Sequence, residues 1–213
     1  FYSASQLIQD ARHHKITILP ICINQSEYDH QLQPEIINGD SRFAIRLGFR
    51  LVKGLSQKAA ELIVAQRTQL TTGQGFITVS QVRALNINQQ ELQALASANA
   101  FKAIAGNRYQ ARWEIMETVS QLPLMTSQVE PEQLSLVPSD ADNLLEDYQS
   151  VGVSLTHHPI QLLMAAKKLP RFTLARELKT KPHKSIVTVI GCVTGRQSPG
   201  TAAGVTFITL EDH

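Results

Sequence analysis

The 213-residue chain contains only two cysteines, Cys22 and Cys192. Each is surrounded by apolar and β-branched residues, as expected for a buried free thiol of a cytosolic protein. No Cys/His spacing of a zinc site is present, and neither His157–His158 nor His13–His14 is interpreted as a metal site. The chain is therefore expected to be cytoplasmic, with neither a disulfide framework nor a bound metal.

Long apolar runs are also missing. No stretch approaches the roughly 20 residues that a membrane-spanning helix needs, and no signal-peptide pattern is present. The composition, with 43% hydrophobic residues, is that of a soluble globular protein without a membrane partner. Because the chain starts at Phe1 rather than Met and ends inside a predicted strand, we expect it to be a piece of a longer protein.

The net charge is only +2, but the charges are unevenly distributed. Residues 41–70 contain six basic side chains and a single acid, Glu61. Residues 128–150 contain six acids and no base, whereas residues 167–184 contain seven bases and one acid, Glu177. Such blocks predict separate surfaces for different partners. For the acidic block, a solvated face in a polar linker remains the alternative.

The segment from Leu47 to Arg67 predicts a helix, a tight turn and a second helix, the layout of a helix-hairpin-helix. Gly54 in the turn can adopt a positive φ or let a phosphate approach, and Ser56 is suited to cap the second helix. The turn would aim free N–H groups and the positive end of that helix at an anion. An ordinary helical hairpin in a core is the alternative. The predicted DNA-binding residues are Lys53, Gly54, Leu55, Ser56, Lys58 and Arg67.

A second, more degenerate hairpin is predicted from Val79 to Phe101. Two capping boxes mark its helices, Thr78 with Gln81 and Asn88 with Glu91, and Asn99 is expected to be a left-handed C-cap. Two stacked hairpins would clasp a duplex backbone better than one. A further helix is predicted over 108–120, where Trp113 is expected to pack on the apolar face rather than to stack on bases.

The pattern as a whole predicts a mainly α protein with a small β part. The other expected elements are a helix over 5–14, a strand over 16–23, a loop over 24–40, a helix over 143–148, a helix that begins at Pro159, and strands over 185–193 and 205–210. The turn between the last two strands is not a phosphate loop, since it lacks the G-x-x-x-x-G-K-[ST] pattern and a following helix. Because two strands cannot bury a core alone, we interpret them as the truncated start of a small β-barrel.

Basic tandem hairpins, an acidic linker and the start of a barrel together resemble a known family. Over essentially its whole length, the chain is similar to the C-terminal part of bacterial C-family DNA polymerases, which include the replicative alpha subunit. The resemblance is carried by FYSASQLIQDARHHKITILPICIN, AIRLGFRLVKGLSQKAAELIVAQR and VTGRQSPGTAAGVTFITLED. Three more segments point to the error-prone, ImuC-type branch, namely NRYQARWEI, EDYQSVGVSLTHHPIQLL and RQSPGTAAGVTFITLEDH.

The resemblance implies a part of a DNA-directed DNA polymerase, a nucleotidyltransferase of translesion synthesis and damage-induced mutagenesis. This part would bind duplex primer–template DNA behind the active site. Ser56 and Asn99 each stand where the family usually has glycine, which leaves the strength of the phosphate contact at Ser56 open. The implied regions are the end of the fingers (1–40), a tandem helix-hairpin-helix DNA-binding region (41–122), an acidic linker (123–142), a helical connector (143–184) and the incomplete start of an OB-fold barrel (185–213).

No catalytic residue, metal site or cofactor is expected in this segment. Nucleotidyl transfer by two metal ions needs carboxylates clustered around Mg²⁺, and the family keeps its catalytic aspartates in a palm upstream. The nearest candidates lie in or beside a linker without flanking strands to fix them. They are Asp140, Asp142, Glu146 and Asp147.

A short peptide in the linker resembles the one with which replicative relatives bind the sliding clamp. Its residues are Gln133, Leu134, Ser135, Leu136 and Val137. In such peptides a Gln and two hydrophobic side chains fill pockets on the ring, and few anchors suffice for a disordered segment. Val137 replaces the usual aromatic residue, and a stretch that packs on the hairpin domain is the alternative. The resemblance also implies accessory proteins of mutagenesis as partners.

A function of another class stays open, a non-enzymatic DNA-binding adaptor of repair or recombination with hairpins and an OB barrel. The upstream sequence discriminates the two. A polymerase requires several hundred preceding residues with paired acids on strands, whereas an adaptor would begin with Met a few residues before Phe1.

Overall fold

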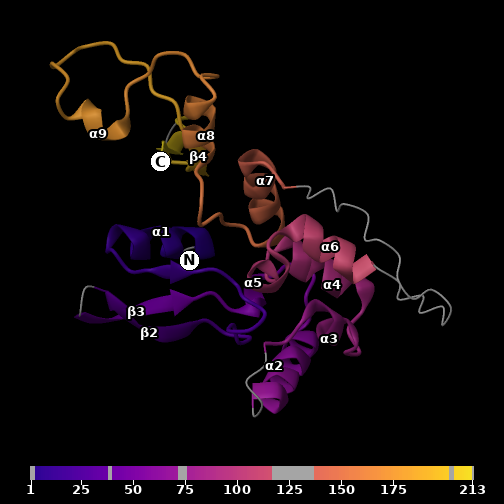
Figure 1. Ribbon diagram of the computed structural model, residues 1–213. Coiled ribbons are helices and arrows are strands. Elements are labelled where there is room, and N and C mark those ends of the chain that lie inside the picture. Colours follow the sequence, from indigo (N-terminus) through magenta and orange to yellow (C-terminus); the bar gives the residue numbers. More distant parts are fainter. Residues whose placement is uncertain (1–2, 38–39, 72–75, 117–136, 202–203, 213) are drawn as a thin grey trace. The chain divides into compact units, whose positions relative to one another are not determined.

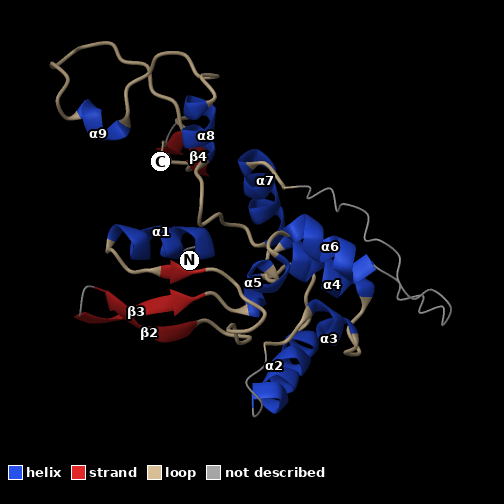
Figure 2. Ribbon diagram, in the orientation of Figure 1, coloured by secondary structure: helices blue, strands red, loops and turns tan. Residues whose placement is uncertain are grey.

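The computed structural model describes residues 3–37, 40–71, 76–116, 137–201 and 204–212. The chain divides into two compact units, Phe1–Leu155 (unit 1) and Thr156–His213 (unit 2). Helices account for most of the regular secondary structure of the described chain, with two small sheets (Figures 1 and 2). The predicted mainly α class with a small β part is therefore confirmed.

Unit 1 begins with a helix and a three-stranded sheet. Helix α1 (Ala4–His13) starts at a capping box of Ser3 and Gln6, close to the predicted position. Strand β1 (Ile18–Leu19) pairs in parallel with β3 (Asp40–Arg46), and β3 pairs antiparallel with β2 (Gln31–Ile37). The sheet order β1-β3-β2 leaves β2 at an edge.

Two predictions for this region are wrong. The predicted strand over 16–23 shrinks to two residues, and the predicted loop over 24–40 contains β2. The polar composition of this segment predicted a loop, but an edge strand tolerates polar side chains, and it tolerates Pro34 because one side of its backbone needs no ladder donor.

The first half of the hairpin is also shorter than predicted. Only a single 3₁₀ turn, η1 (Phe49–Leu51), precedes the turn at Gly54 and helix α2 (Gln57–Thr71). The Phe49 and Arg50 N–H groups donate to the carbonyls of Glu27 and Tyr28, at 2.9 and 3.0 Å. These bonds hold η1 against the loop that precedes β2.

The second half of unit 1 is a cluster of short helices. They are α3 (Val79–Arg83), α4 (Gln89–Ser97), α5 (Lys102–Ala105) and α6 (Arg108–Met116). Both predicted capping boxes are present. Asn99 has φ +57°, while the N–H groups of Asn99 and Ala100 donate back to Ala96 and Leu95. The predicted left-handed C-cap is thus confirmed.

One hydrophobic core joins the loop after β1 to both hairpins. Its fully buried side chains include Ile23, Phe49, Ile63, Ile77, Val82, Leu95 and Phe101. Because the same core holds η1, α2, α3 and α4, the two hairpins are packed together as one body.

Trp113 does not pack as predicted. Its side chain is 66% exposed, and the buried positions of α6 are Arg108, Ala111 and Ile115. The interior-facing side of α6 therefore includes a charged residue, which the search for an apolar face passed over. Residues 117–120 of the predicted helix lie outside the described residues.

Helix α7 (Asp140–Ser150) follows the segment 117–136, which lies outside the described residues. It begins at a capping box of Ser139 and Asp142, inside the predicted linker and before the predicted start at residue 143. Helix α7 packs against α4. Its acids are thus part of the folded unit.

Unit 2 contains helices α8 (Pro159–Ala165) and α9 (Ala175–Leu178) and strands β4 (Cys192–Gln197) and β5 (Phe207–Glu211). His158 caps α8 and Pro159 takes its first position, as predicted. The strands pair antiparallel, with an irregularity between Val193 and Gly195. Residues 185–191, predicted as strand, lie outside both strands of this pair, and β4 continues into the predicted turn.

The two cysteines are free, and both are half-buried rather than buried as predicted. Burial raises the pKa of the Cys192 thiol, so this side chain stays protonated near neutral pH. Within the described ranges, no helix is both long enough and apolar enough to cross a membrane. The same ranges contain no group of three or more His, Cys, Asp or Glu side chains that could hold a metal ion.

Candidate nucleic-acid interface

The turn of the first hairpin has the backbone that its sequence predicts. Gly54 has φ +87°, a conformation that a side chain strains. A Cβ added there would lie 3.7 Å from the Cβ of Ala94 in α4, which is an ordinary contact. Glycine is thus required by its φ rather than by lack of space.

The N-terminus of α2 is partly satisfied from within the chain. The Ser56 hydroxyl accepts a hydrogen bond from the Ala59 N–H at 3.2 Å, which confirms the predicted cap. The Ser56 N–H itself donates to Glu91 of α4 at 3.1 Å. The prediction that the turn aims free N–H groups at an anion is therefore wrong for the N–H of Ser56.

Glu91 is an internal anion at the positive end of α2. The side chain is only 9% exposed, and its second oxygen accepts from the Asn88 N–H at 3.3 Å. Its pKa lies below the usual value, mainly because the Ser56 hydroxyl donates to the carboxylate. Sequence reasoning found Glu91 as a capping-box residue but missed this second role, since the spacing of 35 residues from Ser56 carries no signal.

Three donors of the turn remain available. Among the described residues, no acceptor meets the N–H of Gly54, Gln57 or Lys58. All three residues are exposed. The Lys58 ammonium has no hydrogen-bond or ion-pair partner in the same part of the chain. Three backbone donors, one cation and a helix N-terminus are the features that bind a phosphate.

Most of the predicted basic cluster serves the fold instead. Buried Arg46 donates to the Pro20 carbonyl at 2.9 Å and to two glutamine side chains. Arg67, with a side chain 11% exposed, donates to the Ser26 carbonyl at 2.8 Å and pairs with Glu27. Its guanidinium is thus committed to the loop before β2, away from the predicted role in binding DNA.

Lys53 is directed to α7. Its ammonium donates to the Tyr148 carbonyl at 3.1 Å and its N–H to the Ser150 carbonyl at 2.9 Å, so it caps the end of that helix. The residue remains exposed and lines an open cavity of about 310 Å³. The other residues that line the cavity are Ala94, Ser97, Arg112, Glu146, Gln149 and Ser150.

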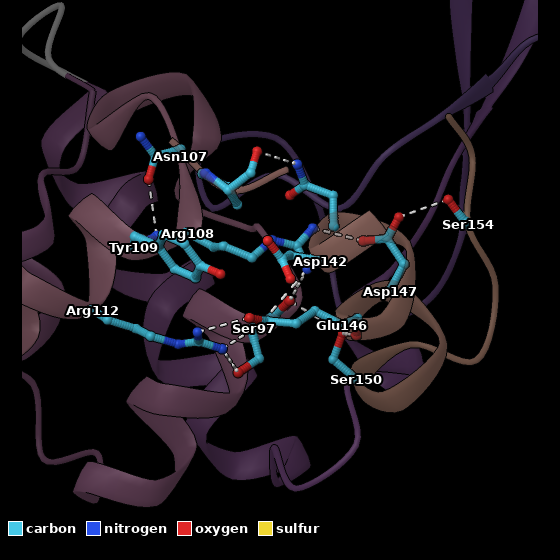
Figure 3. A network of polar contacts seen from close by, with 12 residues as sticks. Ser97, Asn107, Arg108, Tyr109, Arg112, Asp142, Glu146, Asp147, Ser150 and Ser154 are labelled. Carbon is cyan, nitrogen blue, oxygen red and sulfur yellow. Dashed lines mark hydrogen bonds and ion pairs between the residues drawn. The ribbon is translucent and has the colours of Figure 1, made fainter. Parts of the chain in front are cut away.

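A polar network joins α6 to α7 beside this cavity (Figure 3). Arg108, 1% exposed, donates to Asp147 at 2.7 Å and to the Ser97 carbonyl at 3.1 Å. Arg112 pairs with Glu146 and donates to the Ser97 hydroxyl at 2.7 Å. Glu146 and Asp147 are therefore partners of arginines, and their interpretation as a solvated linker face is wrong.

The clamp-like peptide is mostly outside the described residues. Gln133, Leu134 and Leu136 lie there, and only Val137 is described, with a side chain 73% exposed. Clamp binding through this peptide stays a prediction.

Comparison with known proteins supports both the motif and the resemblance. Residues 15–111 match the family described as helix-hairpin-helix motif, a range that includes both hairpins. The chain is 51% identical over 213 residues to the error-prone DNA polymerase of Vibrio campbellii. It is 42% identical over 220 residues to that of Hahella chejuensis and 40% identical over 216 residues to that of Dechloromonas aromatica.

The chain is similar over its whole length to one segment of the error-prone DNA polymerases. Each match covers 100% of this chain and 20% of the relative, so the chain spans about a fifth of the length of the curated relatives it matches. The resemblance to the error-prone branch, stated above from six sequence segments, is confirmed.

Proposed function

We propose that this chain is the DNA-binding segment of an error-prone DNA-directed DNA polymerase, and that its first hairpin holds the backbone of the duplex primer–template. The observation that carries the proposal is the turn at Gly54, where three N–H groups without an acceptor in the described chain stand beside the Lys58 ammonium. The similarity to error-prone DNA polymerases over the whole chain supports the polymerase part of the proposal.

Such a turn binds a phosphate without reading the sequence. Backbone N–H groups and an ammonium contact phosphate oxygens, which are the same at every base pair. The contact is therefore sequence-independent and weakens as salt rises, because a bound phosphate releases condensed counterions. The Glu91 carboxylate limits the turn to a modest anion affinity, since it already occupies one donor.

The activities of the whole polymerase belong to the same proposal. Catalysis with Mg²⁺ takes place in a palm outside this segment. The whole enzyme carries out translesion synthesis in the cytoplasm, and its partners are the sliding clamp and mutagenesis proteins. Strands β4 and β5 begin an OB-type barrel; a bulged antiparallel pair with exposed Val193, Phe207 and Leu210 supports this assignment. The whole-length similarity favours the polymerase over a stand-alone adaptor.

The test is fluorescence-anisotropy titration of the full chain with a labelled blunt duplex at several salt concentrations. Lys58→Gln is expected to weaken binding and to reduce the slope of log affinity against log salt by about 0.9, the value for one phosphate. Lys15→Gln is the matched control, since Lys15 is an equally exposed lysine of unit 1 away from the turn. Equal affinities and slopes for the two variants would contradict the proposal.

A further inference from the structure

The two units carry opposite net charges. Unit 2 has eight Lys and Arg residues and three acids, which give a net charge of +5. Unit 1 has twelve Lys and Arg residues and fifteen acids, which give a net charge of −3. The unit that contains the hairpins is thus the acidic one. The positive excess of the chain lies in unit 2, to which neither of the two helical hairpins belongs.

Most of this excess is concentrated in the stretch 167–184, here called the basic connector. All seven of its Lys and Arg side chains are exposed, and Glu177 is its only acid. Within the described ranges, none of the seven has a hydrogen-bond or ion-pair partner for its charged group. The seven residues are Lys167, Lys168, Arg171, Arg176, Lys179, Lys181 and Lys184.

The basic connector is anchored within unit 2. The Thr173 N–H donates to the Thr188 carbonyl at 2.8 Å, and the Ala175 N–H donates to Asp212 at 2.5 Å. Its first two residues close the end of α8, since the backbone N–H groups of Lys167 and Lys168 donate to the carbonyls of Met164 and Leu163. The cations are therefore presented from a folded segment rather than from a free tail.

Two of the lysines occupy positions that favour glycine. Lys167 has φ +53° and Lys184 has φ +65°, where a side chain is strained and glycine is not. Both positions carry a long cationic side chain, although glycine would adopt this backbone conformation with less strain. Replacing either lysine by glycine should therefore remove a charge without a cost to the backbone.

We propose that the basic connector is a second nucleic-acid surface, which binds the phosphate backbone of DNA by charge. The ligand is a run of phosphates on a single strand or a duplex. Seven cations within 18 residues, none of them paired within the described part of the chain, match the closely spaced charges of a nucleic-acid strand. Base stacking is not part of the proposal, because Phe172, the only Phe, Tyr or Trp of the connector, is half-buried. The proposal does not depend on the hairpin contact, since the two surfaces lie in different units.

The first experiment compares two variants of the full chain by fluorescence anisotropy, each with a labelled duplex and a labelled single strand. Lys179→Gln/Lys181→Gln removes two connector charges, and the control Lys15→Glu changes the net charge by the same two units at an exposed site of unit 1. The connector variant is expected to reduce the salt slope by about 1.8 on duplex or about 1.4 on single strand. The form of DNA that shows the loss identifies the natural ligand.

Three outcomes would overturn the proposal. The connector variant could bind both DNA forms with the wild-type slope, or the control could lose as much as the connector variant. Poly-glutamate of matched charge could also displace the DNA as well as unlabelled DNA does, which would assign the surface to an acidic protein instead. Lys58→Gln, measured alongside, keeps the hairpin contact distinguishable from this one.

A second variant separates a nucleic-acid role from a structural one. Lys167→Gly removes a charge and also relieves the strained backbone, so the thermal midpoint of the chain is expected to stay or rise. DNA affinity is expected to fall in the same protein. A fall in both the thermal midpoint and the DNA affinity, or an unchanged DNA affinity, would contradict the role assigned to Lys167.

Discussion

The arginines of unit 1 and the cations of unit 2 have opposite surroundings. Arg46, Arg67 and Arg108 are buried or nearly so, and each donates to carbonyls or carboxylates that other elements supply. The seven cations of the basic connector are exposed and have no such partners in the described chain. A basic residue is therefore available to a ligand only where the fold does not already use its charge.

The same comparison applies within the first hairpin. Among the residues predicted to bind DNA, Arg67 is held by the loop before β2 and Lys53 caps α7, while Gly54 and Lys58 remain available. The backbone of the turn, rather than a ring of arginines, is what this hairpin offers to a phosphate.

The largest expected effect is on Arg108, which should act on the fold alone. Arg108→Ala leaves Asp147 and Glu146 without their buried cation and is expected to lower the free energy of unfolding by about 3 kcal/mol or more. Urea denaturation followed by circular dichroism measures this loss. Arg50→Ala is the matched control, because its ion pair with Asp29 is exposed and should contribute below about 1 kcal/mol. A loss of similar size in the two variants would contradict the claim that the buried arginine stabilises the fold more than the exposed one.

A smaller effect is expected at Gly54 and Gly106, two of the three glycines with positive φ among the described residues of unit 1. Gly54→Ala and Gly106→Ala should each cost about 1 kcal/mol of stability, because alanine is strained at φ +87° and +79°. Only Gly54→Ala should also weaken duplex binding in the anisotropy titration. If Gly106→Ala weakened it equally, the loss at Gly54 would reflect general destabilisation.

The smallest effect concerns Glu91 and depends on pH. The folded pKa of Glu91 lies below its usual value of 4.5, so its carboxylate stabilises the fold above that pH. This contribution is lost as pH falls through the folded pKa, because the unfolded chain then binds the proton more readily. Glu91→Gln is therefore expected to flatten the loss of stability on acidification. The pKa of Asp142 is also lowered, by its capping serine, but Asp142 is present in the wild type and in Glu91→Gln. Its contribution therefore cancels when the two proteins are compared.

Glu91→Gln also tests the competition at the turn. Removing this negative charge from the N-terminus of α2 should tighten duplex binding at pH 7, since one anion near the site is lost. Weaker binding would instead mean that the carboxylate positions the turn.

Local signals in the sequence were sufficient for some elements. The capping boxes at Thr78 and Asn88, the left-handed Asn99 and the positive φ of Gly54 follow from contacts between residues close in sequence. Strand β2 was not predicted because its pairing with β3 depends on tertiary contacts that the local sequence does not reveal. Its Pro34 is tolerated because β2 lies at the edge of the sheet.

The contents of the candidate site were harder to predict for the same reason. Glu91 meets Ser56 across 35 residues, and Arg108 meets Asp147 across 39. Charge counts in a window of sequence cannot distinguish an arginine that a distant acid will pair from one that stays exposed. The basic connector stood out in sequence because its only nearby acid is Glu177.

Amide hydrogen exchange measured by NMR, with and without a duplex, tests the hairpin contact most directly. The N–H groups of Gly54, Gln57 and Lys58 should exchange fast in the free chain and slow down with duplex, because phosphate oxygens then accept them. The Ser56 N–H, already bonded to Glu91, should change little. Unchanged exchange at Gly54, Gln57 and Lys58 with saturating duplex would contradict the assignment of this turn as the backbone-binding site.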